Sequence, residues 1–222
     1  MLRSRLLLLN MSPKMISMSE RPAVLHEFLP EDYFRRQSYA DIFPDGDASR
    51  ALEVDIGCGD GAFTSALAEA LPDRDFLAVE RLLGRVRKVS SKATRLGLTN
   101  LKVLRLETNY TVCWLLPENG VSRIHLLFPD PWPKDKHENR RVVTPELCAG
   151  VHRALAPDGE WLFKSDHAIY FGERLEVIRG TKLFKEIPWD EEAIYPVTTF
   201  EQQWLDAGKT INRVRLVKAY LW

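Results

Sequence analysis

The chain has 222 residues, 45% of them hydrophobic and 28% charged, a composition that suits one soluble globular domain with a real core. Its 31 basic and 31 acidic residues balance, so an overall basic nucleic-acid-coating protein is excluded, and any anion-binding surface has to be a local patch. Cys58, Cys113 and Cys148 lie far apart and lack metal-ligand spacing. We therefore expect reduced thiols, no bound metal and a cytoplasmic location.

Residues 1–50 are expected to form an N-terminal extension with a disordered start and one short helix. The apolar run Leu6–Leu9 is too short for a signal-peptide core, and no small-residue cleavage site follows it. A start at Met11, Met15 or Met18 explains the region better. The segment 24–37 has the pattern of a short amphipathic helix. No stretch of the sequence is long enough to span a membrane.

From residue 51 to residue 222 the pattern is that of one α/β domain, because short apolar runs alternate with helical patterns. Strands are predicted at 51–56, 75–79, 101–106, 121–128, 160–165 and, late in the chain, within 211–221. Helices are predicted at 63–71, 82–96, 145–155 and 169–179. This rhythm predicts a Rossmann-like, mostly parallel sheet with helices on both faces. In such sheets, ligands bind beyond the carboxyl ends of the strands.

A glycine-rich turn follows the first strand of the domain. Gly57, Gly59 and Gly61 stand at alternate positions between that strand and the next predicted helix. Glycine permits a tight turn and lets the backbone approach a ligand closely. These three residues are therefore candidates for cofactor binding.

Carboxylates follow three successive strands and distinguish between two possible cofactors. Asp55 precedes the glycine turn, Glu80 ends the second strand at the spacing of a ribose-binding carboxylate, and Glu107 follows the third. A dinucleotide fingerprint has a different glycine spacing, and its pyrophosphate would be repelled by Asp55 and Asp60. The same charges suit the ammonium and sulfonium groups of S-adenosylmethionine (SAM). SAM is favoured over NAD.

The loop after the fourth strand has the sequence FPDPWPK, residues 128–134. Two prolines flank Asp130 and restrict its backbone, and Trp132 offers a stacking surface. Basic residues follow at Lys134, Lys136, Arg140 and Arg141. An aromatic side chain beside phosphate-binding charge suits an unstacked base of a nucleic acid. Asp166, after the fifth strand, is a further candidate functional residue.

With the FPDPWPK loop, its two downstream arginines and the segment TTFEQ at 198–202, the chain resembles the bacterial tRNA (guanine-N7)-methyltransferases from about Ala51 to its end. The resemblance implies a SAM-methyltransferase fold with a seven-stranded, mostly parallel sheet. It also implies that the methyl group goes to N7 of guanosine 46 in the variable loop of tRNA. The basic loop departs from the family, which usually has arginine at Lys136, lysine at Asn139 and often lysine at Thr199.

The resemblance also assigns roles to individual residues. It implies that Asp130 is catalytic. The SAM contacts that it implies are Asp55, Glu80, Glu107 and Asp130. The tRNA contacts that it implies are Lys134, Asp166, Thr198, Thr199, Phe200 and Glu201. The enzyme is expected to act as a monomer or homodimer.

Methylation at N7 needs no general base, because this nitrogen has an in-plane lone pair and no proton. Catalysis then consists of positioning, and a fixed carboxylate would stabilise the cationic product. Asp130 has three open roles: stabilising that charge, orienting the guanine, or contacting SAM. Two alternatives remain for the chain: a methyltransferase of another RNA or a small molecule, or a SAM-binding scaffold subunit that only holds tRNA.

Several other polar residues are interpreted as structural. Glu53 and His125 lie within predicted strands, so we expect both to be satisfied by partners inside the fold. The basic residues of the helix predicted at 82–96 fall roughly on one face, for which a solvated surface is the default interpretation.

Overall fold

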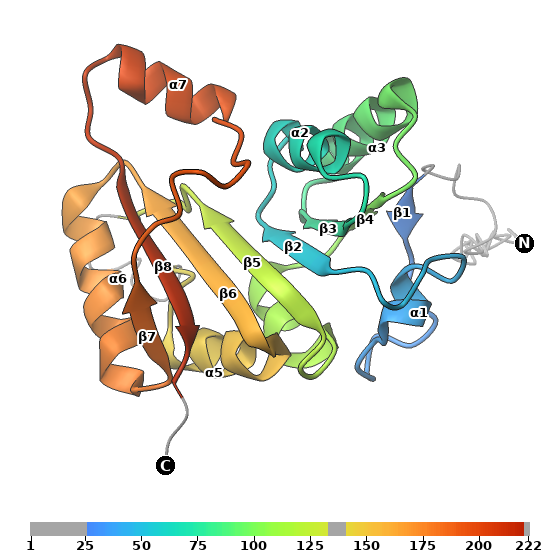
Figure 1. Cartoon of the computed structure of the whole chain (residues 1–222), viewed down its shortest axis with the longest axis horizontal. Coiled ribbons are helices and arrows are strands. Elements are labelled where there is room, and N and C mark those ends of the chain that lie inside the picture. Colours follow the sequence, from blue (N-terminus) through green and yellow to red (C-terminus); the bar gives the residue numbers. More distant parts are fainter. Residues whose placement is uncertain (1–25, 133–140, 220–222) are drawn as a thin grey trace, which may run out of the picture.

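The computed structural model describes residues 26–132 and 141–219, which form one eight-stranded sheet with helices on both faces (Figure 1). The strands are β1 (Glu27–Phe28), β2 (Leu52–Ile56), β3 (Asp75–Val79), β4 (Leu101–Leu104), β5 (Val121–Leu127), β6 (Leu155–Ser165), β7 (Phe184–Ile187) and β8 (Asn212–Lys218). Their order is β1-β4-β3-β2-β5-β6-β8-β7. All neighbours are parallel except that β8 is antiparallel to both β6 and β7. The predicted Rossmann-like fold class is confirmed.

The helices are α1 (Tyr39–Ile42), α2 (Ala62–Ala70), α3 (Leu83–Leu96), α4 (Thr108–Tyr110), a π-helical turn η2 (Thr111–Leu115), α5 (Pro145–Ala154), α6 (Ala168–Thr181) and α7 (Thr199–Asp206). The core has two parts, one on each face of the sheet. Alternation along β3 shows this, because Phe76 belongs to the cluster that includes residues of α2 and α3, whereas Leu77 belongs to the cluster that includes residues of α5 and α6. Every residue of β2 and β3 is buried, as expected for central parallel strands.

The N-terminal segment differs from the prediction. The helix expected over 24–37 is wrong, since its described part contains the short strand β1, and the first described helix begins only at Tyr39. Glu27 and Phe28 pair with Val103 and Leu104 of β4, so the extension adds an edge strand and the sheet has eight strands instead of seven. Pairing with a distant strand outweighs the local helical pattern. The predicted start of the extension lies outside the described residues.

The strand order places a ligand site beside β2. The chain leaves β2 towards β3 on one side, and β5 lies on the other side, so the order reverses at this point. The segment between β7 and α7 crosses over the ends of β6 and β5 towards α2 (Figure 1). Neither β7 nor α7 was predicted from the sequence pattern. The carboxyl ends of β2–β5 frame the site.

Candidate active site

A cleft of about 700 Å³ opens at the carboxyl ends of β2, β3, β4 and β5. Its lining includes Gly57, Glu80, Glu107, Asn109 and Asp130. Four successive strand ends of the predicted site therefore meet at one cavity. Sequence reasoning had singled out each of these residues except Asn109.

The glycine turn between β2 and α2 depends on left-handed backbone at each of its three glycines. Gly57, Gly59 and Gly61 have φ values of 79°, 62° and 73°, a region that L side chains rarely adopt. A Cβ on Gly61 would also lie 2.7 Å from a methyl carbon of Val89 on α3. The turn thus brings β2, α2 and α3 together closely, and Gly57 lies in the wall of the cleft.

Asp55 lies beneath this turn and is 3% exposed. Its carboxylate accepts a hydrogen bond from the hydroxyl of Thr64 on α2. Burial raises the pKa of Asp55, although the charge of His125 and the bond from Thr64 oppose the shift. Asp55 is not among the residues that line the cleft, and its bond with Thr64 joins β2 to α2.

Glu80 and Glu107 both accept hydrogen bonds from backbone N–H groups that follow them. An oxygen of the buried Glu80 lies 2.9 Å from the nitrogen of Leu82, and its other oxygen lies 3.4 Å from Arg85. Glu107 is exposed and caps α4 by accepting from the nitrogen of Tyr110 at 2.8 Å. These bonds fix both carboxylates at the cleft, and each ionised carboxylate retains further acceptor capacity.

Asn109 is a polar residue of this site that sequence reasoning missed. Its side-chain oxygen is buried and has no hydrogen-bond partner among the described residues. A buried acceptor without a partner costs free energy, so an unmet acceptor in a cleft wall points to a ligand donor. A signal was present in the sequence, because Asn109 stands only two residues after Glu107, the carboxylate that follows the third predicted strand.

The loop after β5 places Asp130 at the exposed mouth of the cleft. Phe128 and Trp132, on either side of it, both have positive φ, at 52° and 42°. Non-glycine residues in this region indicate a backbone held by its surroundings. Part of that hold comes from Arg141, whose guanidinium donates to the carbonyl of Trp132 at 3.4 Å and to Glu173 at 3.0 Å.

Arg141 therefore corrects one expectation. The sequence places it among the basic residues that face tRNA, but it is 9% exposed and ion-paired with Glu173 of α6. Its guanidinium donates hydrogen bonds to Glu173 and to the carbonyl of Trp132, so it braces the loop. Lys134, Lys136, His137 and Arg140 lie outside the described residues.

The segment at Thr198–Glu201 forms the first turn of α7. The hydroxyl of Thr198 accepts from the nitrogen of Glu201 at 2.8 Å and so caps the helix. Phe200 is half exposed, and its ring centroid lies 6.0 Å from that of Phe128 at the cleft. This contact brings the C-terminal segment beside the loop that carries Asp130. Asp166 is half-buried and follows the end of β6.

Glu201 is 6% exposed and forms an ion pair with Lys164 of β6 at 2.7 Å. Its second carboxylate oxygen is buried and has no partner among the described residues. Burial lowers the pKa of Lys164, while the hydrogen bond that Lys164 donates to Glu201 opposes the shift. Glu201 thus combines a fixed position with one free acceptor.

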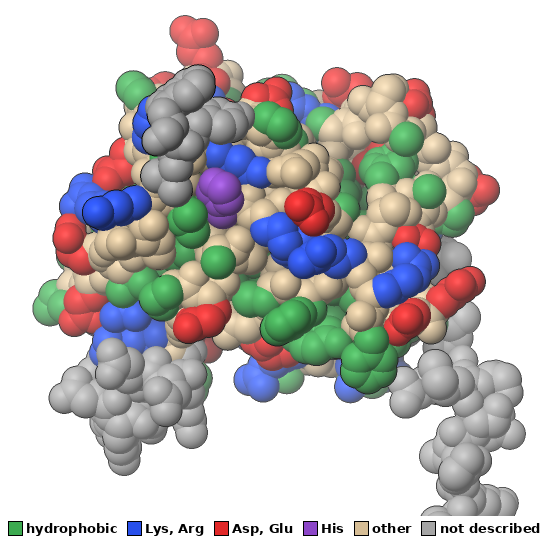
Figure 2. All heavy atoms as spheres, turned by 90° about the horizontal axis from the view of Figure 1, so that it is seen from below, with side chains coloured by type: hydrophobic (Ala, Val, Ile, Leu, Met, Phe, Trp, Pro, Cys, Tyr) green, Lys and Arg blue, Asp and Glu red, His purple; other side chains and the backbone are tan. Residues whose placement is uncertain are grey.

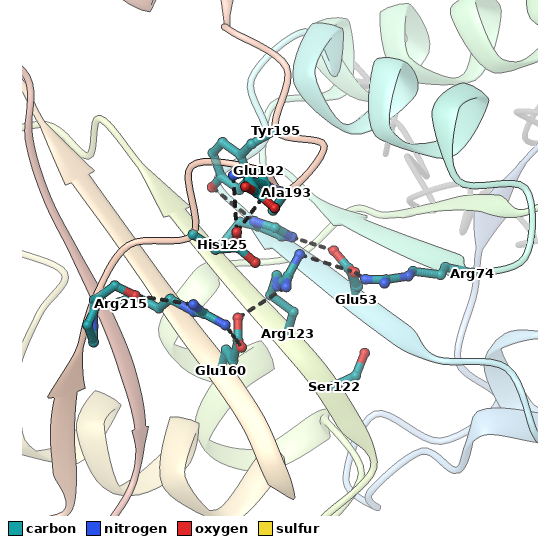
Figure 3. Close-up of polar contacts among 12 residues, drawn as sticks. Glu53, Arg74, Ser122, Arg123, His125, Glu160, Glu192, Ala193, Tyr195 and Arg215 are labelled. Carbon is teal, nitrogen blue, oxygen red and sulfur yellow. Dashed lines mark hydrogen bonds and ion pairs between the residues drawn. The ribbon is translucent and has the colours of Figure 1, made fainter.

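A buried polar network fastens the crossing segment to the sheet (Figure 3). The phenol of Tyr195 lies 3.1 Å from Nδ1 of His125 on β5, and Nε2 of His125 lies 2.8 Å from Glu53 on β2. Arg74 and Arg123 also pair with Glu53. The expectation that Glu53 and His125 are satisfied within the fold is confirmed.

Two comparisons of sequence bear on what this site does. A family model described as a putative methyltransferase, Methyltransf_4, matches residues 49–214. A tRNA (guanine-N(7)-)-methyltransferase of Anaeromyxobacter dehalogenans (strain 2CP-C) is 34% identical over 192 residues, which cover 81% of this chain and 94% of the relative. One of the same name from Nocardioides sp. (strain ATCC BAA-499 / JS614) is 34% identical over 164 residues, which cover 74% of this chain and 66% of the relative.

Solved structures agree on the fold. The 16S rRNA methyltransferase KamB has a TM-score of 0.60 at 19% identity, and the match covers 83% of this chain and 96% of that one. The antibiotic-resistance methyltransferase Kmr has a TM-score of 0.58 at 18% identity, with 84% and 95% covered. The chain spans 66% of the Nocardioides relative's length and 51% of a Thermotoga maritima relative's length. On the sequence matches, the chain belongs to the family of the tRNA (guanine-N(7)-)-methyltransferases.

Proposed function

We propose that this protein transfers a methyl group from SAM to N7 of guanosine 46 in the variable loop of tRNA. One observation carries the proposal: Glu80, Glu107 and Asp130 follow three different strands and line a single cleft. Relatives that carry the name tRNA (guanine-N(7)-)-methyltransferase support the choice of substrate.

The residues of the cleft fit SAM. A left-handed glycine turn lets the backbone approach the ligand, and Glu80 can accept from ribose hydroxyls. The unmet side-chain oxygen of Asn109 can accept from an amine, as can Glu107 beside it. A pyrophosphate would meet carboxylates in the same cleft, which disfavours a dinucleotide.

The chemistry assigned to the protein is positioning and electrostatics. When bound, SAM supplies a methyl group activated by the positive charge on its sulfur. Asp130 stands at the cleft mouth on a loop whose backbone Arg141 holds at Trp132, which restricts where its carboxylate can lie. The methylated guanine is cationic, and a preorganised carboxylate favours charge that develops in the transition state. No proton leaves N7, so no side chain is assigned as a general base.

The guanosine is proposed to enter beside α7. Phe200 offers an exposed ring next to Phe128, and the free oxygen of Glu201 can accept from a base N–H group. Thr198 and Thr199 belong to the same turn. Lys134 and Asp166 are retained as proposed tRNA contacts, although Lys134 lies outside the described residues.

The location and the oligomeric state of the enzyme are part of the proposal. Over residues 26–132 and 141–219, the helices lack the length and apolar character needed to cross a membrane. The same part of the chain holds no cluster of three or more side chains suited to a metal ion. We propose that the enzyme works in the cytoplasm on tRNA, as a monomer or homodimer.

The test is to incubate the pure protein with labelled SAM and unmodified tRNA, digest the RNA and identify the methylated nucleoside. We expect 7-methylguanosine from the wild-type tRNA and none from a matched tRNA with adenosine at position 46. Label in another nucleoside, or in both RNAs equally, would indicate a different RNA substrate. Binding of SAM and tRNA without any transfer would indicate a scaffold subunit.

A further inference from the structure

The charged residues on the exposed face of α3 are all basic. The helix has five basic residues and no acidic residue, within a chain of zero net charge. Val86, Val89 and Ala93 are buried against the sheet, whereas Arg87, Lys88 and Arg95 are exposed. On the face seen in Figure 2, by contrast, acidic and basic side chains lie interspersed. Within α3, basic residues therefore stand without an acidic residue in the same helix.

Little of this charge is neutralised within the protein. Lys92 lies 3.9 Å from Asp60, and Arg85 lies 3.4 Å from Glu80. Within the described part of the chain, Arg87, Lys88 and Arg95 form no ion pair with a carboxylate. They line a shallow hollow of about 410 Å³ together with Ser91, Lys92 and Asp60.

The basic face continues from the mouth of the cleft. Arg81 and Arg85 line the cleft itself, and α3 begins between them. A helix of 14 residues extends about 20 Å. A strand of nucleic acid that leaves the cleft along α3 would thus pass from Arg85 to the hollow at Arg87, Lys88 and Arg95.

We propose that Arg87, Lys88 and Arg95 form a second RNA-binding surface that holds backbone phosphates of the tRNA outside the nucleotide in the cleft. The inference rests on the proposed function. A guanidinium group can donate two parallel hydrogen bonds to the oxygens of one phosphate. Lysine and arginine side chains that lack a carboxylate partner can neutralise RNA phosphates, and this releases the counterions bound to the RNA. Among the described residues, Leu82 at the N-cap of α3 is a large exposed apolar side chain, whereas no residue within Leu83–Leu96 is one. A membrane-binding helix would carry an apolar stripe along its exposed length, and Arg87, Lys88 and Arg95 stand in place of such a stripe.

The test compares tRNA affinity as a function of salt concentration in the wild-type protein and in the triple variant Arg87→Ala/Lys88→Ala/Arg95→Ala. Each lost phosphate contact should reduce the log–log slope by about one, and the affinity should fall about tenfold or more. SAM affinity and the methylation rate at saturating tRNA should be unchanged, because these side chains lie outside the cleft.

Two controls separate charge at this face from charge in general. The charge-preserving variant Arg87→Lys/Lys88→Arg/Arg95→Lys should retain most of the affinity. Lys185→Ala, on the distant strand β7, should leave both affinity and slope unchanged, whereas Lys88→Ala alone should lower them.

The outcomes distinguish this surface from the proposed function. If the triple variant keeps the tRNA affinity and the salt slope of the wild-type protein, the proposed RNA-binding surface is wrong, whereas the proposed methylation is unaffected. A loss of binding to anionic vesicles without a loss of binding to tRNA would overturn it too. If wild-type protein binds tRNA without methylating it, and the triple variant loses that binding, the surface stands and the proposed function fails.

Discussion

The ammonium of Lys164 on β6 lies 2.7 Å from the carboxylate of Glu201 on α7, and both side chains are buried. The ammonium also lies 4.6 Å from the ring centroid of Tyr195 and 5.3 Å from that of Trp189. A single cation therefore joins the sheet, the crossing segment and the first turn of α7. It holds Glu201 in place against the sheet, with the second carboxylate oxygen buried and without a partner among the described residues.

Replacing Lys164 by Met should loosen this junction, because Glu201 then becomes a buried charge without its partner. Such a loss costs about 3–5 kcal/mol of stability. Lys164→Met together with Glu201→Gln should recover much of it. Chemical unfolding of both variants measures the difference, and equal stability of the single and double variants would contradict the role assigned to the pair.

Glu80 is predicted to contribute directly to SAM binding. Glu80→Ala should weaken SAM affinity about tenfold or more, since a buried hydrogen bond to a charged group is worth about 1.5–3 kcal/mol. Glu69→Ala, at an exposed site on α2, serves as the matched control. Calorimetric titration gives both affinities. Tight NAD binding, with SAM unbound by the wild-type protein, would exclude the assigned cofactor.

Gly61→Ala should destabilise the fold by about 1–3 kcal/mol, because the residue has a positive φ and its new methyl group would collide with Val89. Gly172→Ala provides the contrast, because no atom lies within 4 Å of its added Cβ inside α6. That change should be neutral or stabilise by up to about 1 kcal/mol. Urea unfolding of the two variants measures whether the free energy of unfolding falls in Gly61→Ala and stays equal or rises in Gly172→Ala.

Acid should weaken the protein through Glu53. Burial alone would raise the pKa of Glu53, but the hydrogen bond and charge of His125, with Arg123 and Arg74, lower it from 4.5 to about 2. A depressed folded-state pKa contributes stability above pH 4.5 that is lost as the pH falls towards 2. Between about pH 5 and about pH 3, the wild-type protein should lose about 2 kcal/mol from this group.

Glu53→Gln removes this titration. Its unfolding free energy should therefore fall less between the same two pH values than that of the wild-type protein, even if the variant is less stable at neutral pH. Parallel pH dependence in the two proteins would show that Glu53 does not carry the effect.

The central strands were predictable because their burial is continuous in the sequence. Residues 75–79 form β3 with the predicted bounds, since a parallel strand covered on both faces needs an unbroken buried run. Strand β1 was not predictable in this way. Its two residues are defined only by pairing with β4, a contact across more than seventy residues of chain.

The candidate site was predictable where a residue type and a strand end coincide, as at Glu80 and Asp130. It was not predictable where a side chain could turn either way. Arg141 is one of two adjacent arginines in a basic loop, and only the packed structure pairs it with Glu173 of α6. The cap at Thr198 did have a local signal, because Glu201 follows it three residues later, the spacing of a helix start.

Asp130 carries the central claim, that a fixed carboxylate at the cleft mouth speeds methyl transfer to guanine N7. Asp130→Asn keeps the shape of the side chain and removes its charge. The decisive measurement is the single-turnover rate of tRNA methylation by this variant at saturating SAM. The account predicts a rate lower by about 10²-fold or more, as for loss of a preorganised electrostatic partner, with tRNA affinity little changed. A rate near that of the wild-type enzyme would contradict it and leave Asp130 as a structural residue of its loop.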